Sequence, residues 1–165
     1  MGIEIERKFL VVGAGWRGGD GVRIRQGYLN RDPERTVRVR IAGGRAFLAI
    51  KGLTRGAVRS EFEYEIPALE AEQLLGLCEG GVLDKTRHEV PFGGFRWEID
   101  EFHGRHAGLV LAEIELSHPG EAFPRPRRLR VEVPDAGLSE PAGSCLRFAS
   151  RTARRLRSPR TGVRS

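Results

Sequence analysis

The stretch that decides the fold is IEIERKFLVV, at residues 3–12. Apolar and polar residues alternate along most of it, and this period of two predicts a β-strand. One face carries Glu4, Glu6 and Lys8, because successive side chains of a strand point to opposite sides of the sheet. Two carboxylates two residues apart are separated by roughly 6.6 Å along a strand. Both can therefore reach one cation, and without a counter-charge they repel each other.

Pairs of like charges at this spacing recur along the chain. They are Arg38 with Arg40, Lys85 with Arg87, and Glu113 with Glu115. Any one pair is explained by the solvated side of an antiparallel sheet. Like charges on one face destabilise a sheet unless an opposite charge lies between them. Their repetition in a short chain therefore favours a charged binding surface.

Length and composition indicate one compact domain. The 165 residues are enough for a sizeable core. Cys78 and Cys145 lack the spacing of metal ligands, and two distant cysteines without a secretory leader are typical of a reduced, cytoplasmic protein. The longest apolar run, near residues 109–112, is too short to span a bilayer.

The net charge of +6 is concentrated at the end of the chain. Residues 147–165 hold seven arginines and no acidic residue, which leaves 21 basic and 22 acidic groups for residues 1–146. We expect residues 1–146 to form the domain and the basic segment to be disordered, because it has too few apolar residues to offset its ordering entropy. This segment is either a plain solvated tail or a tether that binds nucleic acid weakly.

The pattern along the chain predicts eight strands, one helix and a second helix after Glu121. The strands are expected at residues 3–12, 22–29, 35–41, 45–51, 58–66, 82–90, 95–102 and 109–117, and the helix at residues 69–79, where Gly80 and Gly81 stop it. Gly43 and Gly44 predict a tight hairpin. In the second strand Arg23 and Arg25 share a face, and a bulge at Gly27 would bring Tyr28 to the same side.

Eight hairpin-linked strands fit a closed barrel, because closure removes the exposed edges of the sheet. The alternation alone leaves open whether the charged faces point outward or inward. If they point inward, helices or a second subunit must cover the apolar outer faces. Two helices are too few for this, which favours a homodimer.

The opening motif Glu4-Ile5-Glu6-Arg7-Lys8 resembles the Glu-x-Glu-x-Lys motif of the CYTH, or triphosphate tunnel metalloenzyme, family, and above all its short bacterial members. Further matching elements follow in family order over roughly residues 2–118: Arg25-Gln26-Gly27-Tyr28-Leu29, Arg38-x-Arg40, Lys51, Arg59-x-Glu61-x-Glu63, Lys85-x-Arg87, Glu98-x-Asp100 and Glu113-x-Glu115. Beyond Pro119 the chain departs from the family pattern, so a closing helix is not predicted from it.

The resemblance implies a mainly β (α+β) fold, an eight-stranded antiparallel closed barrel with a few outer helices and with charges facing a tunnel. It implies that triphosphate is bound by Lys8, Arg25, Arg38, Arg40, Lys51, Lys85 and Arg87. It also implies that Mg²⁺ or Mn²⁺ is bound by Glu4, Glu6, Asp100, Glu113 and Glu115, whose hard oxygen ligands suit these ions. Lys8 and Tyr28 are the expected catalytic residues.

The function implied by the resemblance is metal-dependent hydrolysis of inorganic tripolyphosphate to pyrophosphate and phosphate. Adenylate cyclase and thiamine triphosphatase remain open, because no motif that reads an organic moiety is visible in the sequence. A non-catalytic polyphosphate-binding module is the alternative from another class. Turnover that depends on metal would separate the enzyme from the module.

Overall fold

The computed structural model describes residues 2–13, 16, 20–55, 58–127, 129–133 and 152. The elements of this part are, in chain order, β1 Gly2–Val11, β2 Val22–Asn30, β3 Arg35–Ala42, β4 Arg45–Gly52, β5 Val58–Ile66, α1 Ala68–Gly76, β6 Glu79–Phe92, β7 Phe95–Phe102, the 3-10 turn η1 Gly104–His106, β8 Val110–Glu115 and β9 Leu129–Val133. The predicted domain boundary at residue 146 and, apart from residue 152, the basic segment lie outside the described residues. No helix of the described part is long and apolar enough to cross a membrane.

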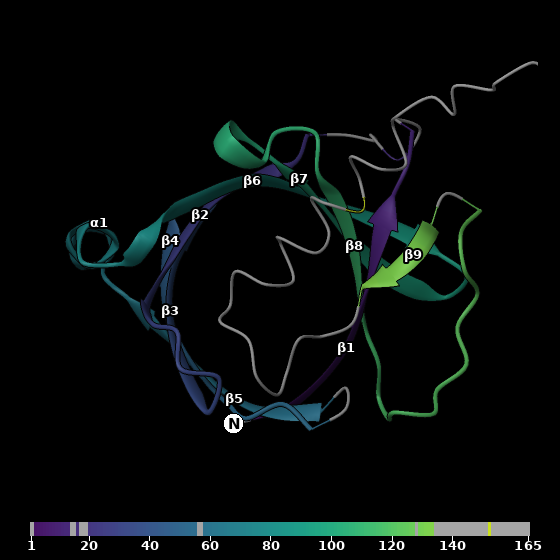
Figure 1. The fold of residues 1–165 in the computed structure, drawn as a ribbon, viewed down its shortest axis with the longest axis horizontal. Helices are drawn as coiled ribbons and strands as arrows, with labels where there is room; N and C mark the ends of the chain where they lie inside the picture. The colour runs from purple at the N-terminus through teal and green to yellow at the C-terminus, as the bar shows by residue number, and fades with distance from the viewer. Residues whose placement is uncertain are drawn as a thin grey trace, which may run out of the picture.

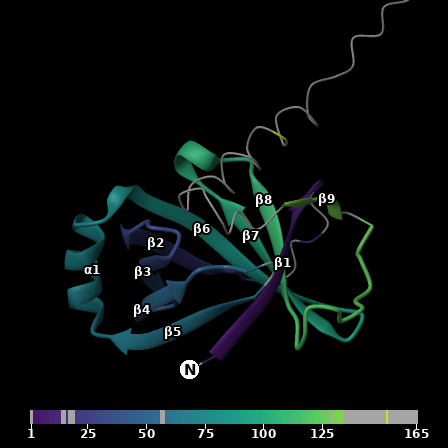
Figure 2. The ribbon, with the colours of Figure 1, turned by 60° about the horizontal axis from the view of Figure 1, so that its bottom comes forward.

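The first eight strands form a closed antiparallel barrel (Figure 1). Neighbouring strands follow the order β5-β4-β3-β2-β6-β7-β8-β1, and β1 returns to β5 through pairs from Gly2↔Glu61 to Ile5↔Val58. The second half of β1 pairs with β8 on one edge and with β9 on the other. Figure 2 shows β1 running obliquely across the wall toward β9. The predicted eight-stranded closed barrel is therefore confirmed, with a ninth strand in addition.

Glycine turns make the hairpins of the barrel. Gly43 and Gly44 join β3 to β4, and Gly93 and Gly94 join β6 to β7. All four have positive φ angles, which glycine adopts at little cost because it lacks a Cβ atom. The predicted hairpin at Gly43 is confirmed.

The helix α1 packs on the outer side of the barrel (Figure 1). Its buried residues Ala71 and Leu75 contact Val39 and Ala46 of the sheet. The helix ends at Gly76, before the expected stop, and Gly80 and Gly81 instead lie inside β6 with positive φ angles. The predicted C-terminal end of the helix was therefore wrong.

Residues 121–126 form no helix, so α1 is the single α-helix among the described residues from 2 to 133, and the expected few outer helices are not found in that range. Pro124 and Pro126 supply no N–H donors for a helix in this segment. Phe123 instead packs edge-on against Trp97 and Phe95, at centroid distances of 5.8 and 6.4 Å. The irregular segment around Phe123 thus covers the outer face of β1, β7 and β8, while β9 extends the sheet along the edge of β1.

Close packing of Cys78, which follows the C-terminal end of α1, against β2 predicts that Gly27→Ala destabilises the protein. A Cβ atom at Gly27 would lie 2.7 Å from Cβ and Sγ of Cys78, and such overpacking costs about 1–3 kcal/mol. Denaturant unfolding measures the loss. The control is Gly76→Ala, where no atom lies within 4 Å and no loss is expected. Equal stability of Gly27→Ala and the parent would contradict the close approach of the two elements.

Candidate active site

The barrel is lined with charge on its inner face. The inward-pointing charged residues are Glu4, Glu6 and Lys8 on β1, Arg38 and Arg40 on β3, Lys51 on β4, Arg59, Glu61 and Glu63 on β5, Lys85 and Arg87 on β6, Glu98 and Asp100 on β7, and Glu113 and Glu115 on β8. Directly paired residues of neighbouring strands share a face, and the pairs Lys8↔Glu113, Lys51↔Glu61 and Arg87↔Asp100 place these side chains together. The question of which way the charged faces point is thereby answered: they point inward.

Opposite charges from neighbouring strands separate the like-charged pairs. Lys51 Nζ lies 2.9 Å from Glu4 Oε2 and 3.1 Å from Glu61 Oε1. The guanidinium of Arg59 bridges Glu4 and Glu6, at 2.6 and 2.7 Å. Glu4 and Glu6 are thus neutralised by cations even without a metal ion.

The same alternation continues around the barrel. Lys8 Nζ is 2.8 Å from Glu6 and 2.9 Å from Glu113. Arg87 contacts Glu113 at 2.8 Å and also pairs with Glu98. On the far wall Arg40 lies 2.9 Å from Glu63, and Arg38 lies 3.3 Å from Glu61.

The deepest ion pair joins Lys85 and Asp100. Lys85 Nζ is 2.5 Å from Asp100 Oδ2, and Arg87 Nη2 is 2.6 Å from the same oxygen. Burial lowers the pKa of Lys85, although Asp100 raises it. Asp100 is fully enclosed and already held by two cations, so it is the least accessible carboxylate of the lining.

Two of the carboxylates are strongly stabilised in their ionised form. Burial alone would raise the pKa of Glu4, but Lys51 and Arg59 outweigh it and lower the value to about 2. Burial likewise opposes ionisation of Glu113. The positive charges of Lys8, Lys85 and Arg87 outweigh this effect and hold the pKa of Glu113 well below the usual range. Glu98 differs, because burial raises its pKa.

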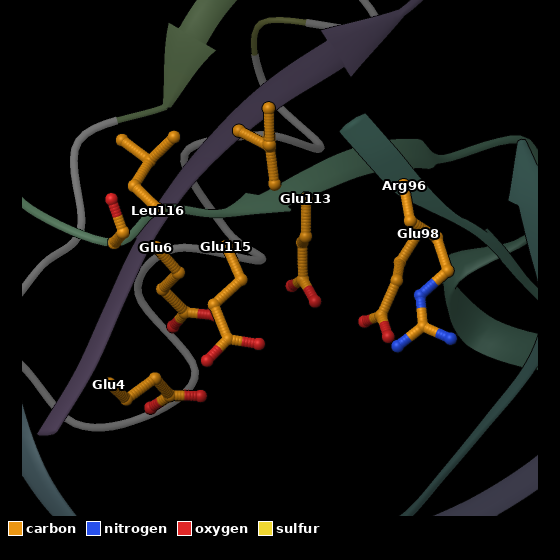
Figure 3. Close-up of a pocket in the computed structure, with 9 residues that line it drawn as sticks. Glu4, Glu6, Arg96, Glu98, Glu113, Glu115 and Leu116 are labelled. Atoms are coloured by element: carbon orange, nitrogen blue, oxygen red, sulfur yellow. The ribbon is translucent and has the colours of Figure 1, made fainter. Parts of the chain in front are cut away.

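Carboxylates converge on one cavity of about 410 Å³ at the mouth of the barrel. Glu4, Glu6, Glu98, Glu113 and Glu115 line it, with the guanidinium of Arg96 at its side (Figure 3). Within the described part of the chain, the side chain of Glu115 takes part in no hydrogen bond or ion pair. Glu115 is therefore the carboxylate most ready to accept a new partner.

The residues fit a divalent cation by donor chemistry. Hard carboxylate oxygens suit Mg²⁺ and Mn²⁺, and Glu4, Glu6, Glu113 and Glu115 surround one space. The described residues contain no group of three acidic, histidine or cysteine side chains already arranged around a point that could hold a metal. An ion would therefore have to replace the present lysine and arginine partners of these carboxylates.

The structure gathers most of the predicted site residues, but not Arg25. Arg25 points out of the barrel and pairs with Glu72 of α1 at 2.6 Å. The inward positions of β2 are Ile24 and Gln26, which lie opposite Lys85 and Arg40. The expectation for Arg25 was wrong because α1 covers the face of β2 that carries the arginines. Asp100 is inside, but it does not line the cavity of the other predicted metal ligands.

Tyr28 lies on the inner side of β2 without a bulge at Gly27. Gln26 pairs with Leu83 of β6, and Tyr28 pairs with Glu79. The extra residues between these two pairs therefore belong to β6, where Gly80 and Gly81 lie. Tyr28 packs against a buried apolar cluster rather than among the ion pairs.

Five charged residues of the site were absent from the predicted set: Arg59, Glu61, Glu63, Glu98 and Arg96. The first four stand in the motifs that carry the family resemblance, so their spacing was a usable signal. Arg96 stands two residues before Glu98, so the period of two already placed it on the face of Glu98 and Asp100.

A closed β-barrel with interleaved acidic and basic side chains inside offers partners for anions and for cations in one interior. The CYTH domain family model matches residues 2–132, and the chain belongs to this family. An inorganic triphosphatase of Acetivibrio thermocellus is 45% identical over 135 residues, which cover 81% of this chain and 86% of that protein. An inorganic triphosphatase of Nitrosomonas europaea is 37% identical over 118 residues, which cover 68% of this chain and 76% of that protein.

A solved structure agrees with this assignment. The crystal structure of an inorganic triphosphatase superposes with a TM-score of 0.58 at 32% sequence identity, and covers 81% of this chain and 90% of that one. The family resemblance read from the residues is thereby confirmed.

The buried ion pair predicts that Lys85→Met destabilises the protein. Without Lys85, the enclosed Asp100 keeps only Arg87 as a cation partner, and the loss of a hydrogen bond to a buried charged group costs about 1.5–3 kcal/mol. The matched control is Arg45→Met, because Arg45 pairs with Glu65 at the exposed rim, where an ion pair contributes about 0–1 kcal/mol. Denaturant unfolding of both variants without ligand checks the difference. A Lys85→Met protein as stable as the parent would mean that repulsion between the inner cations dominates instead.

Proposed function

We propose that the protein is a divalent-metal-dependent hydrolase that cleaves inorganic tripolyphosphate to pyrophosphate and phosphate. The observation that carries this proposal is the cavity in which five glutamates face the cations of the same barrel. Membership of the CYTH family and two relatives named inorganic triphosphatase support the choice of substrate. Adenylate cyclisation and thiamine triphosphate hydrolysis gain no support from a base-binding or ring-binding pocket among the described residues.

The basic residues would bind and orient the phosphate chain. Arg38 and Arg40 on β3, Lys51 on β4, and Lys85 and Arg87 on β6 surround the interior from three strands. Phosphoryl transfer depends mainly on positioning and on neutralising charge, and guanidinium groups can engage two phosphate oxygens at once. Lys8 is the proposed catalytic cation, because it lies between Glu6 and Glu113 and can neutralise charge on the leaving oxygen. Tyr28 is proposed to hold the deepest phosphate through its hydroxyl group.

The acidic residues would hold Mg²⁺ or Mn²⁺. Glu4, Glu6 and Glu115, which line the cavity, are proposed for one ion. A second ion is proposed near Glu113 or Asp100. Such ions supply neutralisation of phosphate oxygens and activation of a water molecule. The protein's own part is to keep the carboxylates ionised, and the low pKa of Glu4 secures this well below neutral pH.

The protein is further proposed to act in the cytoplasm as a homodimer. Val37, Ile50 and Phe62 lie side by side on the outer face of β3, β4 and β5, and Tyr64 is more than half exposed beside them. An uncharged sheet face of this kind suits a second copy. Analytical ultracentrifugation is expected to give the dimer mass for the parent and for Leu69→Glu on α1, and the monomer mass for Ile50→Glu. A monomeric parent would contradict the proposal.

The basic segment at residues 147–165 is proposed to bind nucleic acid weakly, if it binds it at all. Seven arginines without an acidic residue provide charge but no specificity. Such binding would disappear at high salt and would leave tripolyphosphate hydrolysis unchanged.

Glu115→Gln tests the metal-dependent activity most cleanly. Glu115 has no cation partner among the described residues, so its neutralisation should leave the melting temperature within about 2 °C of the parent. We expect turnover of tripolyphosphate at limiting Mg²⁺ to fall at least about tenfold, a loss of roughly 1.4 kcal/mol in ion binding or transition-state stabilisation. The measurement is phosphate release over a Mg²⁺ titration.

The control variant is Glu70→Gln on the outer helix α1, which should keep the parent's Mg²⁺ dependence. Unchanged turnover of Glu115→Gln at every Mg²⁺ concentration would contradict the assignment of Glu115 to the metal. Absence of any turnover of tripolyphosphate by the parent protein with Mg²⁺ would contradict the proposed function itself.

A further inference from the structure

Strand β2 contributes a neutral inner face between two positively charged strands. On one side of it, β3 carries Arg38 and Arg40 on its inner face. On the other side, β6 carries Lys85 and Arg87. The inward residues of β2 over this stretch carry no charge, and they are Val22, Ile24, Gln26 and Tyr28. A phosphate chain bound by the cations of both neighbouring strands would therefore extend across the inner face of β2.

Gln26 is a buried polar residue of this face. It is 6% exposed, and its Oε1 atom has no hydrogen-bond partner among the described residues. Almost all buried polar groups in folded proteins are hydrogen-bonded, because an unpaired acceptor has lost its contact with water and has gained no other. The amide oxygen of Gln26 thus does not stabilise the fold, and it can accept a hydrogen bond from a ligand in the interior.

Two hydrogen-bond donors on the adjacent strand are also unpaired. Gln26 is paired with Arg40 of β3, and Arg38 lies at the next inward position of that strand. The Nε atoms of both arginines are buried and have no hydrogen-bond partner in the described part of the chain. Cβ atoms of directly paired residues are about 4.5–5.5 Å apart, and diagonal neighbours are about 7–8 Å apart. The inner face of β2 and β3 therefore places one unpaired acceptor close to two unpaired donors.

The chemistry of these three groups distinguishes phosphate from water. Ionised phosphate oxygens accept hydrogen bonds, so a bound phosphate chain can pair with the Nε atoms of Arg38 and Arg40. It cannot pair with Oε1 of Gln26, because a carbonyl oxygen is an acceptor as well. A water molecule can donate one hydrogen bond to Oε1 and keep a lone pair free for another atom. Oε1 of Gln26 therefore fits a water molecule that lies against the phosphate chain.

The place of β2 in the barrel suits the geometry of phosphoryl transfer. From β1 the wall runs through β5, β4 and β3 to β2 in one direction, and through β8, β7 and β6 in the other, so β2 lies opposite β1 (Figure 1). In phosphoryl transfer the attacking oxygen and the leaving oxygen lie roughly in line with the phosphorus atom. With Lys8 of β1 at the leaving oxygen, as proposed above, the attack comes from the wall that carries Gln26.

We propose that Gln26 is a positioning residue that orients the attacking water molecule by accepting one of its hydrogen bonds at Oε1. The amide takes up no proton. The water oxygen forms a bond to phosphorus while the bridging P–O bond breaks, and the electron pair of that bond leaves with pyrophosphate. Both protons of the water remain on the orthophosphate that is formed. This inference rests on the proposed function, because it assumes that a phosphate chain is hydrolysed in this interior.

The test compares Gln26→Met with the parent, because methionine keeps the length of glutamine and removes both polar atoms of the amide. The kcat for tripolyphosphate with Mg²⁺ is expected to fall about 10–100-fold, since misplacing a reacting group costs up to about 100-fold. The KM is expected to stay unchanged, and so is the Kd of a methylene-bridged tripolyphosphate measured by calorimetry. A higher KM with unchanged kcat would mean that the amide binds the substrate instead of the water, and would overturn the proposal.

Two further variants separate the acceptor from packing. Ile24→Met places the same side chain on the same face of β2 without removing a polar atom, and we expect it to keep the kcat of the parent. Gln26→Glu keeps an acceptor oxygen but adds a negative charge, so its KM should rise while its kcat falls less than that of Gln26→Met. Equal losses of kcat in the two Gln26 variants would assign the effect to packing and would overturn the proposal.

The melting temperature gives a readout that is independent of activity. Gln26→Met is expected to melt at or above the temperature of the parent, because the exchange removes an unpaired buried acceptor. A lower melting temperature would show that the amide stabilises the fold, which contradicts the proposal. If the parent hydrolyses no tripolyphosphate, the proposed function itself fails. If the parent hydrolyses it and Gln26→Met has the same kcat, the function stands and the role of Gln26 is refuted.

Discussion

The structure depends on ion pairs that cross between neighbouring strands inside the barrel. Each like-charged pair of the sequence would repel itself on an isolated strand. In the folded chain Arg59 lies between Glu4 and Glu6, and Lys51 reaches both Glu4 and Glu61. The pairing of β1 with β5 and β8 brings these charges together, so the strand register and the charge balance specify each other.

The same ion pairs explain how a strongly charged interior can be both stable and reactive. A buried charge is tolerated when it is paired and hydrogen-bonded. In the proposed function, a triphosphate and a metal ion would replace these pairs, because the phosphates would bind the lysines and arginines and the metal ion would bind the carboxylates. The charges are already in place before binding.

The sequence predicted the parts of the site that depend on a period of two. Glu4, Glu6, Lys8, Glu113 and Glu115 share faces for that reason alone, and the structure places them around the same interior. The direction of the faces did not follow from alternation, because a charged face suits solvent as well as a tunnel. The family resemblance supplied it.

Two features could not be predicted from the sequence. One is which side of a strand faces the interior when both sides carry polar residues, and the other is how deep in the barrel each side chain lies. On β2 arginines alternate with Ile24 and Gln26, so only the packing of α1 shows that Arg25 faces outward. The period of two assigns Glu98 and Asp100 to one face of β7. It does not predict that Glu98 lines the cavity, whereas Asp100 is enclosed by Lys85 and Arg87. The short β9 was missed because five residues carry too little pattern.

The central claim, that phosphates and metal ions replace the internal ion pairs together, is tested most directly by thermal unfolding with a methylene-bridged tripolyphosphate that cannot be hydrolysed. The melting temperature is measured with Mg²⁺ alone, with the analogue alone and with both. The account predicts that both together raise it by more than the sum of the separate shifts, because each ligand releases the partners of the other and binding to the native state stabilises it by mass action. A melting temperature that is unchanged by the two ligands together would contradict the account.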